Sequence, residues 1–231
     1  MKRAFFFGLI ATICGLTAAL LISLFMFTFN SNFYLWAMDN AGVYEQAGTD
    51  RPSISFVVED LVSYLRGSDI KFDRKIVIDG ELRAEFNARE VTHMADVRRL
   101  FRLAQYACAV VLLITVVFAV LSWKARQPRA VGWGLISGTL LLIAFGTFVY
   151  VQSRNETTFF SMFYRFHELL FTNDLWLLDP RTDLLIRLMP TQFFMLFAAA
   201  VGGVWALCVA AATAFGVWLA VRKRFSLRIN P

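Results

Sequence analysis

Two histidines, His93 and His167, are the residues of this chain best suited to chemistry, because imidazole moves protons near neutral pH. His93 precedes a long apolar run that begins at Leu103, and His167 lies in an aromatic-rich segment. On a helix, Glu90 and Asp96 would each lie three residues from His93, where a carboxylate could hold one imidazole nitrogen and fix its tautomer. The pattern indicates general acid–base catalysis.

Other interpretations of these residues stay open. A lone histidine in a loop is more often a hydrogen-bonded structural residue, and the carboxylates can belong to a solvated helix face with Arg98 and Arg99. The segment 167–171 begins like the zinc-protease motif HExxH, but Phe171 stands where the second histidine would be. The three cysteines all lie inside apolar runs: Cys14, Cys108 and Cys208. We therefore expect no metal ion and no cofactor.

The composition is that of a membrane protein. Of the 231 residues 58% are hydrophobic and 17% are charged, whereas a soluble domain is about one quarter charged. Four runs without Lys, Arg, Asp, Glu or His reach the ~20 residues that cross the bilayer core: 4–29, 103–123, 131–151 and 193–221. We predict one integral membrane domain over 1–231, an all-α core of four transmembrane helices with a small α+β extracytoplasmic cap from 30–102 and 152–192.

The charge distribution predicts the orientation. The short segments 1–3, 124–130 and 222–231 hold nine cations and no acid, and all 17 acidic residues lie in the two large loops. By the positive-inside rule both termini are cytoplasmic and the cap lies outside. The net charge of +6 then reflects topology and attraction to membrane lipids, so no nucleic-acid partner is expected.

Local signals predict the elements of the cap. A helix is expected over 54–66, after Asp50 and before Gly67, and Asp79-Gly80 predicts a two-residue hairpin turn. Asn87 and Glu90 form a capping pattern for a helix that continues into the second span. In the second loop, helices are expected over 157–171 and 182–189, with Asp179 and Asp183 as possible caps.

Two segments of the chain resemble the signature segments of a bacterial membrane-protein family, the lipoprotein intramolecular transacylases (Lit). They are His93-Met94-Ala95-Asp96-Val97-Arg98 and FHELLFTNDLWLLDPRTDLLIRLMPTQFF over 166–194. The four-span layout with large first and third loops agrees with that family, and Tyr64-Leu65 is similar to the Tyr-Leu of its early cap helix.

The resemblance implies an acyl transfer within one substrate, a diacylated lipoprotein N-terminus. The sn-2 acyl chain of the diacylglyceryl group moves to the α-amino group of the N-terminal cysteine, which gives a lyso-form lipoprotein. It implies that His93 and His167 are catalytic. The residues expected to orient them or position the substrate are Asp96, Asn173, Asp174, Trp176, Tyr64 and Phe166.

The residues themselves are consistent with this chemistry. One imidazole can take a proton from the amine, and the other can protonate the leaving oxygen or stabilise the oxyanion. We expect activity to fall as the pH drops through about 6.5, where a base imidazole becomes protonated. Asn173 is a candidate oxyanion donor. An aromatic wall would exclude water: Phe159, Phe160, Phe163, Tyr164, Phe166 and Trp176.

Two alternatives from other classes remain. The same two histidines could serve an acyltransferase or hydrolase that acts on another membrane lipid. A non-enzymatic membrane protein could instead bind a partner through the cap, with both histidines structural.

Overall fold

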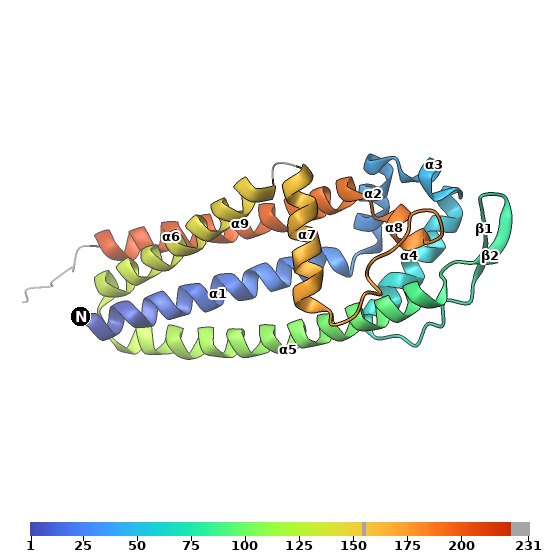
Figure 1. Ribbon diagram of the computed structural model, residues 1–231. Helices are drawn as coiled ribbons and strands as arrows, with labels where there is room; N and C mark the ends of the chain where they lie inside the picture. Colours follow the sequence, from blue (N-terminus) through green and yellow to red (C-terminus); the bar gives the residue numbers. More distant parts are fainter. Residues whose placement is uncertain (154–155, 223–231) are drawn as a thin grey trace, which may run out of the picture. The chain divides into compact units, whose positions relative to one another are not determined.

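The computed structural model describes residues 1–153 and 156–222, with the side chains of Tyr150 and of 152–159 excepted. Apart from one two-stranded hairpin, the regular elements of this part are helices (Figure 1). The chain divides into two compact units. The first comprises 1–20, 107–152 and the chain from Val204 onward, and the second comprises 21–106 and 153–203.

In the described part of the chain, four helices cover the four apolar runs except for Phe29, and each is long and apolar enough to cross a membrane. They are α1 (Lys2–Thr28), α5 (Ala88–Lys124), α6 (Pro128–Ser153) and α9 (Thr191–Val221). The chain is therefore a multi-pass membrane protein. Helix α5 is longer than a span needs and begins before the apolar run at Leu103. This first part carries six charged side chains: Arg89, Glu90, Asp96, Arg98, Arg99 and Arg102. That charged part, with His93, lies outside the membrane-spanning segment.

Within the first unit, small residues allow close helix packing. A Cβ atom added at Gly8 would lie 2.5 Å from the carbonyl oxygen of Val131, so α1 and α6 meet backbone to backbone. Close approach through glycine is a common way for helices to associate in lipid, where no hydrophobic force drives them together. The indole nitrogen of Trp205 donates to the carbonyl oxygen of Leu16 at 2.9 Å and joins α9 to α1.

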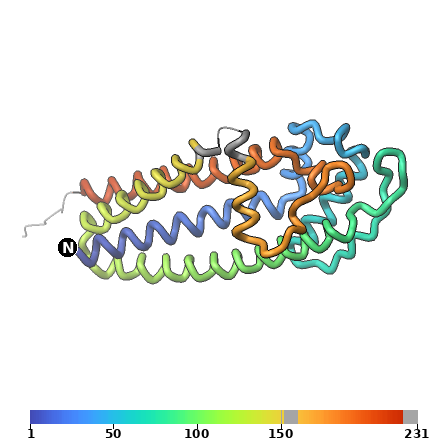
Figure 2. Tube along the Cα trace, viewed as in Figure 1, coloured from blue at the N-terminus to red at the C-terminus, as the bar shows by residue number. Residues whose placement is uncertain are grey.

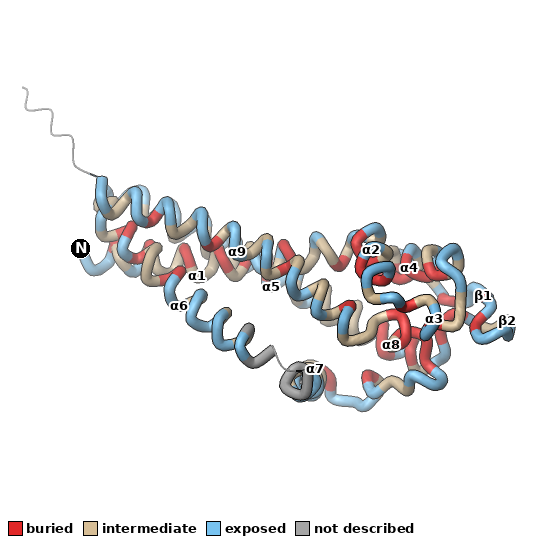
Figure 3. The backbone as a smooth tube through the Cα atoms, turned by 90° about the horizontal axis from the view of Figure 1, so that it is seen from above, coloured by how far each residue is buried: buried red, intermediate tan, exposed pale blue. Residues whose placement is uncertain are grey.

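The core of the second unit is built around α4 (Arg51–Arg66). Asp50 caps its N-terminus by accepting from the amide of Ser53 at 2.8 Å, and Gly67 ends it in the left-handed conformation. The expected helix is thus confirmed. Its buried face packs against α2 (Ser31–Ala41), and α3 (Val43–Ala47) packs against α2 and α8 (Leu184–Leu188). Buried residues gather on these four elements (Figure 3).

The predicted hairpin is also confirmed. Strands β1 (Lys75–Ile78) and β2 (Glu81–Ala84) pair antiparallel, and both turn residues, Asp79 and Gly80, have positive φ. The buried guanidinium of Arg187 on α8 donates to both carboxylate oxygens of Asp79, at 2.8 and 2.9 Å. This pair fixes the hairpin turn to α8.

The start of α5 has the expected capping box. Asn87 accepts from the amide of Glu90 at 3.1 Å, and the Glu90 carboxylate accepts from the amide of Asn87 at 2.8 Å. The other oxygen of Glu90 accepts from the amide of Leu185 at 2.6 Å. Glu90 is therefore a structural link between α5 and α8.

The second loop differs from prediction in two respects. Helix α7 (Glu156–Leu170) forms as expected, but the helix expected over 182–189 shortens to α8. Asp179 and Asp183 do not cap helices with their side chains. The carboxylate of Asp179 pairs with Arg181. The carboxylate of Asp183 accepts hydrogen bonds from Asn87, from Thr182 and from the amide of Asp179, and these bonds stabilise the loop.

Candidate functional site

The two histidines lie side by side in the second unit. Their ring centroids are 6.4 Å apart, although His93 comes from α5 and His167 from α7. The segment that follows α7 runs back to the first turns of α5 in the chain trace (Figure 2), which brings the two loops together. His93 is buried, with 7% of its surface exposed, and His167 is partly exposed. The pair is thus largely buried, and His167 is its more accessible member.

Aromatic rings surround this pair. Phe171 lies 5.3 Å from His93 and 5.6 Å from His167 between ring centroids, so one ring contacts both imidazoles. Phe163 and Trp176 lie 4.0 and 5.0 Å from His167. Such walls keep water away from a reacting group and strengthen electrostatic interactions beside it.

The two imidazoles have different hydrogen bonds. Nδ1 of His167 lies 2.7 Å from the carbonyl oxygen of Phe163, which can only accept, so Nδ1 carries the proton. The neutral ring then has its lone pair on Nε2. Nδ1 of His93 is buried and has no hydrogen-bond partner among the described residues. His167 is therefore held in the Nδ1–H tautomer, whose free Nε2 can act as a base.

Burial sets the protonation of both rings. The pKa of His93 is lowered to about 4, mainly because burial disfavours the imidazolium; His167 and Arg89 act in the same direction, and Asp96 opposes them. Burial also lowers the pKa of His167, against the effect of its hydrogen bond to Phe163. Both imidazoles are neutral at pH 7, as a base requires.

The carboxylates expected to orient His93 have other partners. Asp96 accepts from the side-chain amide of Asn173 at 2.9 Å, and Glu90 serves the capping box. In the described part of the chain neither carboxylate hydrogen-bonds to His93. Asn173 also accepts from the amide of Leu175 at 3.1 Å. Asp96 and Asn173 therefore hold the segment after α7 against α5.

A second polar contact holds the same segment. Arg89, one turn before His93, donates to the carbonyl oxygen of Asp174, whose carboxylate lies 3.9 Å away. Arg89 was not among the residues singled out from the sequence, and neither was Phe171 as a contact of both histidines. The spacing of four residues between Arg89 and His93 was the available signal, because it places them on one helix face.

The remaining predicted site residues divide into two groups. Trp176 is buried against His167, and Phe166 is 53% exposed with its ring 5.5 Å from that histidine. Tyr64 packs on Phe72 and lies under the guanidinium of Arg98. It makes no ring contact or hydrogen bond with either histidine in the residues described. Phe159 lies outside the residues whose side chains the structure describes.

Comparisons with known proteins agree on one family. Residues 9–194 match the family model described as lipoprotein intramolecular transacylase Lit. A sequence comparison with curated proteins gives no match.

Three similar solved structures show the membrane-integral Lit of Bacillus cereus. The first is 21% identical, with a TM-score of 0.75 over 94% of this chain and 96% of that chain. The second and third are variants in which one histidine is replaced by arginine or by alanine. Both have a TM-score of 0.70 over 94% of this chain; they are 20% and 19% identical, over 92% and 94% of those chains. Since the family model covers residues 9–194 of 231 and the fold agrees over 94% of the chain, this chain belongs to the lipoprotein intramolecular transacylase family.

Proposed function

We propose that this protein moves the sn-2 acyl chain of a diacylglyceryl group to the α-amino group of a lipoprotein N-terminal cysteine, with His93 and His167 as its catalytic residues. The observation that carries the proposal is the pairing of two neutral imidazoles, 6.4 Å apart, inside an aromatic enclosure. Membership of a transacylase family supports an acyl transfer on lipoproteins.

The chemistry needs only proton movement and positioning. The neutral amine attacks the ester carbonyl, a C–N bond forms, and the C–O bond to the glyceryl oxygen breaks. One proton leaves the nitrogen and one arrives on that oxygen, so water, metal and cofactor are not consumed. Because amine and ester belong to one molecule, holding them together provides a large part of the rate enhancement.

The tautomer of His167 suits it to the role of base. Its Nε2 lone pair can take the amine proton while Nδ1 keeps its bond to Phe163. His93 then serves the leaving oxygen or the tetrahedral oxyanion. His93 is neutral at pH 7 as well, so it can donate a ring N–H to the oxyanion, and the proton that His167 takes from the amine is the one available to the leaving oxygen.

The orientation proposed for the chain is cytoplasmic termini with the cap outside. It rests on the cations of the short segments, of which Lys223, Arg224 and Arg228 lie outside the described residues. Single cysteines at Ser68 and at Arg126, in a background without Cys14, Cys108 and Cys208, test it. A membrane-impermeant thiol reagent should label the first from outside and leave the second unlabelled; the reverse would overturn the orientation.

The reaction itself is tested with a synthetic lipopeptide that carries different acyl chains at sn-1 and sn-2. Transfer leaves the mass unchanged, so products are read by fragmentation and after mild alkaline cleavage of esters. After ester cleavage, the expected product keeps one acyl chain, the former sn-2 chain, which is bound to nitrogen as an amide. Release of that chain as free fatty acid would favour the hydrolase alternative.

A matched pair of variants accompanies this assay. Replacement of both histidines by alanine should abolish transfer, whereas Leu169→Ala, an exposed change on α7, should leave it intact. Full transfer by the histidine-free protein would overturn the proposed mechanism.

A further inference from the structure

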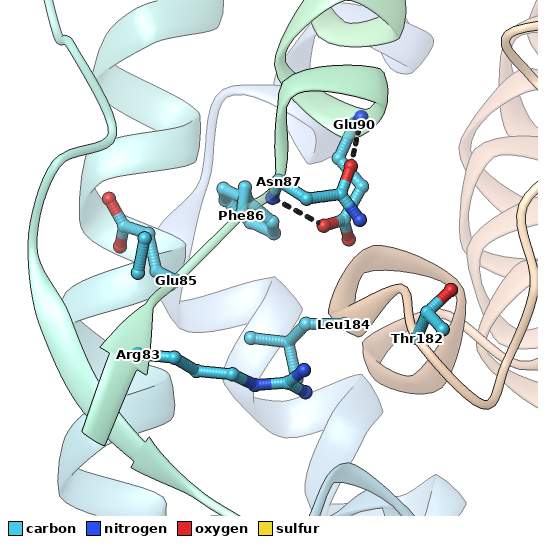
Figure 4. Close-up of a pocket in the computed structure, with 8 residues that line it drawn as sticks. Arg83, Glu85, Phe86, Asn87, Glu90, Thr182 and Leu184 are labelled. Carbon is cyan, nitrogen blue, oxygen red and sulfur yellow. Dashed lines mark hydrogen bonds between the residues drawn. The ribbon is translucent and has the colours of Figure 1, made fainter. Parts of the chain in front are cut away.

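A small pocket lies in the cap beside the start of α5 (Figure 4). Its volume is about 180 Å³, and it is lined by Arg83, Ala84, Glu85, Phe86, Asn87, Glu90, Thr182 and Leu184. Sites for drug-sized molecules occupy ~300–1,000 Å³, so this pocket is too small for an acyl chain or a whole head group. It matches a short piece of peptide.

Most polar groups on the pocket wall already have partners. Asn87 and Glu90 are joined by the capping box, and Glu90 also accepts from Leu185. The hydroxyl of Thr182 donates to Asp183 at 2.8 Å. The carboxylate of Glu85, just after β2, points to the opposite side of the backbone from the guanidinium of Arg83 (Figure 4). Asn87, Glu90 and Thr182 therefore shape the pocket and need no ligand, whereas both carboxylate oxygens of Glu85 are buried without a hydrogen-bond partner among the described residues.

Like Glu85, Arg83 has buried polar atoms without a hydrogen-bond partner among the described residues. Its guanidinium reaches from β2 towards Leu184 (Figure 4), and its Nε and Nη2 atoms are buried without a hydrogen-bond partner among the described residues. A buried donor without an acceptor is costly, and more so when the group is charged. The pocket therefore calls for an oxygen acceptor placed between Arg83 and the wall formed by Leu184.

His93 follows the pocket wall along α5. Glu90 on its wall lies three residues before His93, so the two side chains share a face of α5 and are separated by a rise of ~4.5 Å. One peptide residue spans ~3.3–3.6 Å when extended. A chain whose first residue reacts at His93 would reach the pocket with its second residue.

We propose that this pocket is the peptide subsite of the enzyme, and that Arg83 binds the main-chain carbonyl of the residue that follows the lipidated cysteine. The inference rests on the proposed function for what lies at His93. A main-chain carbonyl is present in every lipoprotein, so such a contact fixes the direction of the peptide without selecting a sequence.

Kinetics with two substrates test the subsite. One is a diacylglyceryl-cysteine peptide of four residues; the other is diacylglyceryl-cysteine methylamide, which lacks the second carbonyl. In the wild-type protein the methylamide should have a KM about tenfold higher. Arg83→Met should raise KM for the peptide about tenfold, with little change in kcat, and should leave the methylamide unaffected. Lys75→Met, which removes an exposed cation from the paired strand, is the control.

The outcomes separate the subsite from the reaction. Equal KM values for the two substrates in the wild-type protein, which needs no variant to fold, would overturn the subsite. So would an Arg83→Met protein that converts the peptide normally. Binding of an N-acetylated lipopeptide, which cannot react, is measured in parallel. If nothing is converted and this binding still weakens about tenfold in Arg83→Met, the proposed reaction fails and the subsite stands.

Discussion

Asn173 donates its side-chain amide to Asp96 at 2.9 Å, and this bond crosses from the segment after α7 to the helix that bears His93. Asp96 lies three residues after His93, and Arg89 binds the neighbouring carbonyl of Asp174 from four residues before it. Two polar contacts therefore flank the buried imidazole and hold the segment that carries Trp176 over His167.

A double-mutant cycle measures the first of these contacts. Asp96→Ala and Asn173→Ala should each lower kcat by about tenfold or less, because the bond is exposed and only positions other groups. The double variant should be scarcely worse than either single variant, since residues in direct contact are not additive. Fully additive losses in the lipopeptide assay would show that the two side chains act separately.

The histidines should behave differently from their neighbours. His93→Ala and His167→Ala should each lower kcat by ~10²–10⁴, the usual contribution of general acid–base catalysis. If the two imidazoles act as one unit, the double variant loses little more. The measurement is lipopeptide conversion by proteins whose thermal unfolding in detergent matches the wild type. Near-normal conversion by either stable single variant would remove that histidine from the mechanism.

The pH dependence follows from burial. Ordinary imidazoles would lose base function through about pH 6.5, but the folded pKa of His93 is about 4 and that of His167 is also lowered. Both rings therefore stay neutral as the pH falls below 6.5. We expect the histidine limb of the kcat profile to lie below pH 6.5, at the lower pKa values of the buried rings. A histidine limb at 6.5 or above in saturating lipopeptide would contradict the burial of the pair.

The same shift has a consequence for stability. A histidine buried in its neutral form binds its proton more weakly than it does in the unfolded chain. The unfolded state therefore takes up more protons as the pH falls below about 6.5, and the folded state loses stability from there towards the folded pKa. His93→Gln should reduce this loss between pH 6.5 and 4, as measured by thermal unfolding in detergent. An unchanged pH dependence would show that His93 does not contribute to it.

Local signals in the sequence predicted the parts of the fold whose causes are local. Asp50 and Gly67 bound α4, and Asp79-Gly80 forms the hairpin turn, because caps and tight turns need particular residues at particular positions. Helices α2 and α3 were not predicted. Their short segments follow an apolar run without a break in composition. Helix α2 is stabilised by packing on α4, and α3 by packing on α8 and α2.

The candidate site was predictable in its residues and not in its contacts. His93 and His167 stand out by type, but the spacing of Asp96 suggested a bond to His93 that the structure replaces with one to Asn173. A neighbour on the same helix competes with partners that only the tertiary fold brings near. The contact of Phe171 with both rings, and of Arg89 with Asp174, depends in the same way on where α7 ends.

The glycine contacts of the first unit lead to the last prediction. A Cβ atom at Gly134 would lie 2.8 Å from the backbone nitrogen of Leu9, and backbone cannot move aside as a side-chain end can. Gly134→Ala should therefore lower the free energy of unfolding by about 1–3 kcal/mol, the usual cost of overpacking, despite the better helix propensity of alanine. Gly203→Ala on α9 is the matched control, because among the described residues no atom beyond its chain neighbours and its own helix backbone lies within 4 Å of the added Cβ. Thermal unfolding in detergent should show a lower midpoint for the first variant and an equal or higher one for the second. Equal midpoints for both would mean that α1 and α6 do not approach as closely as this contact requires.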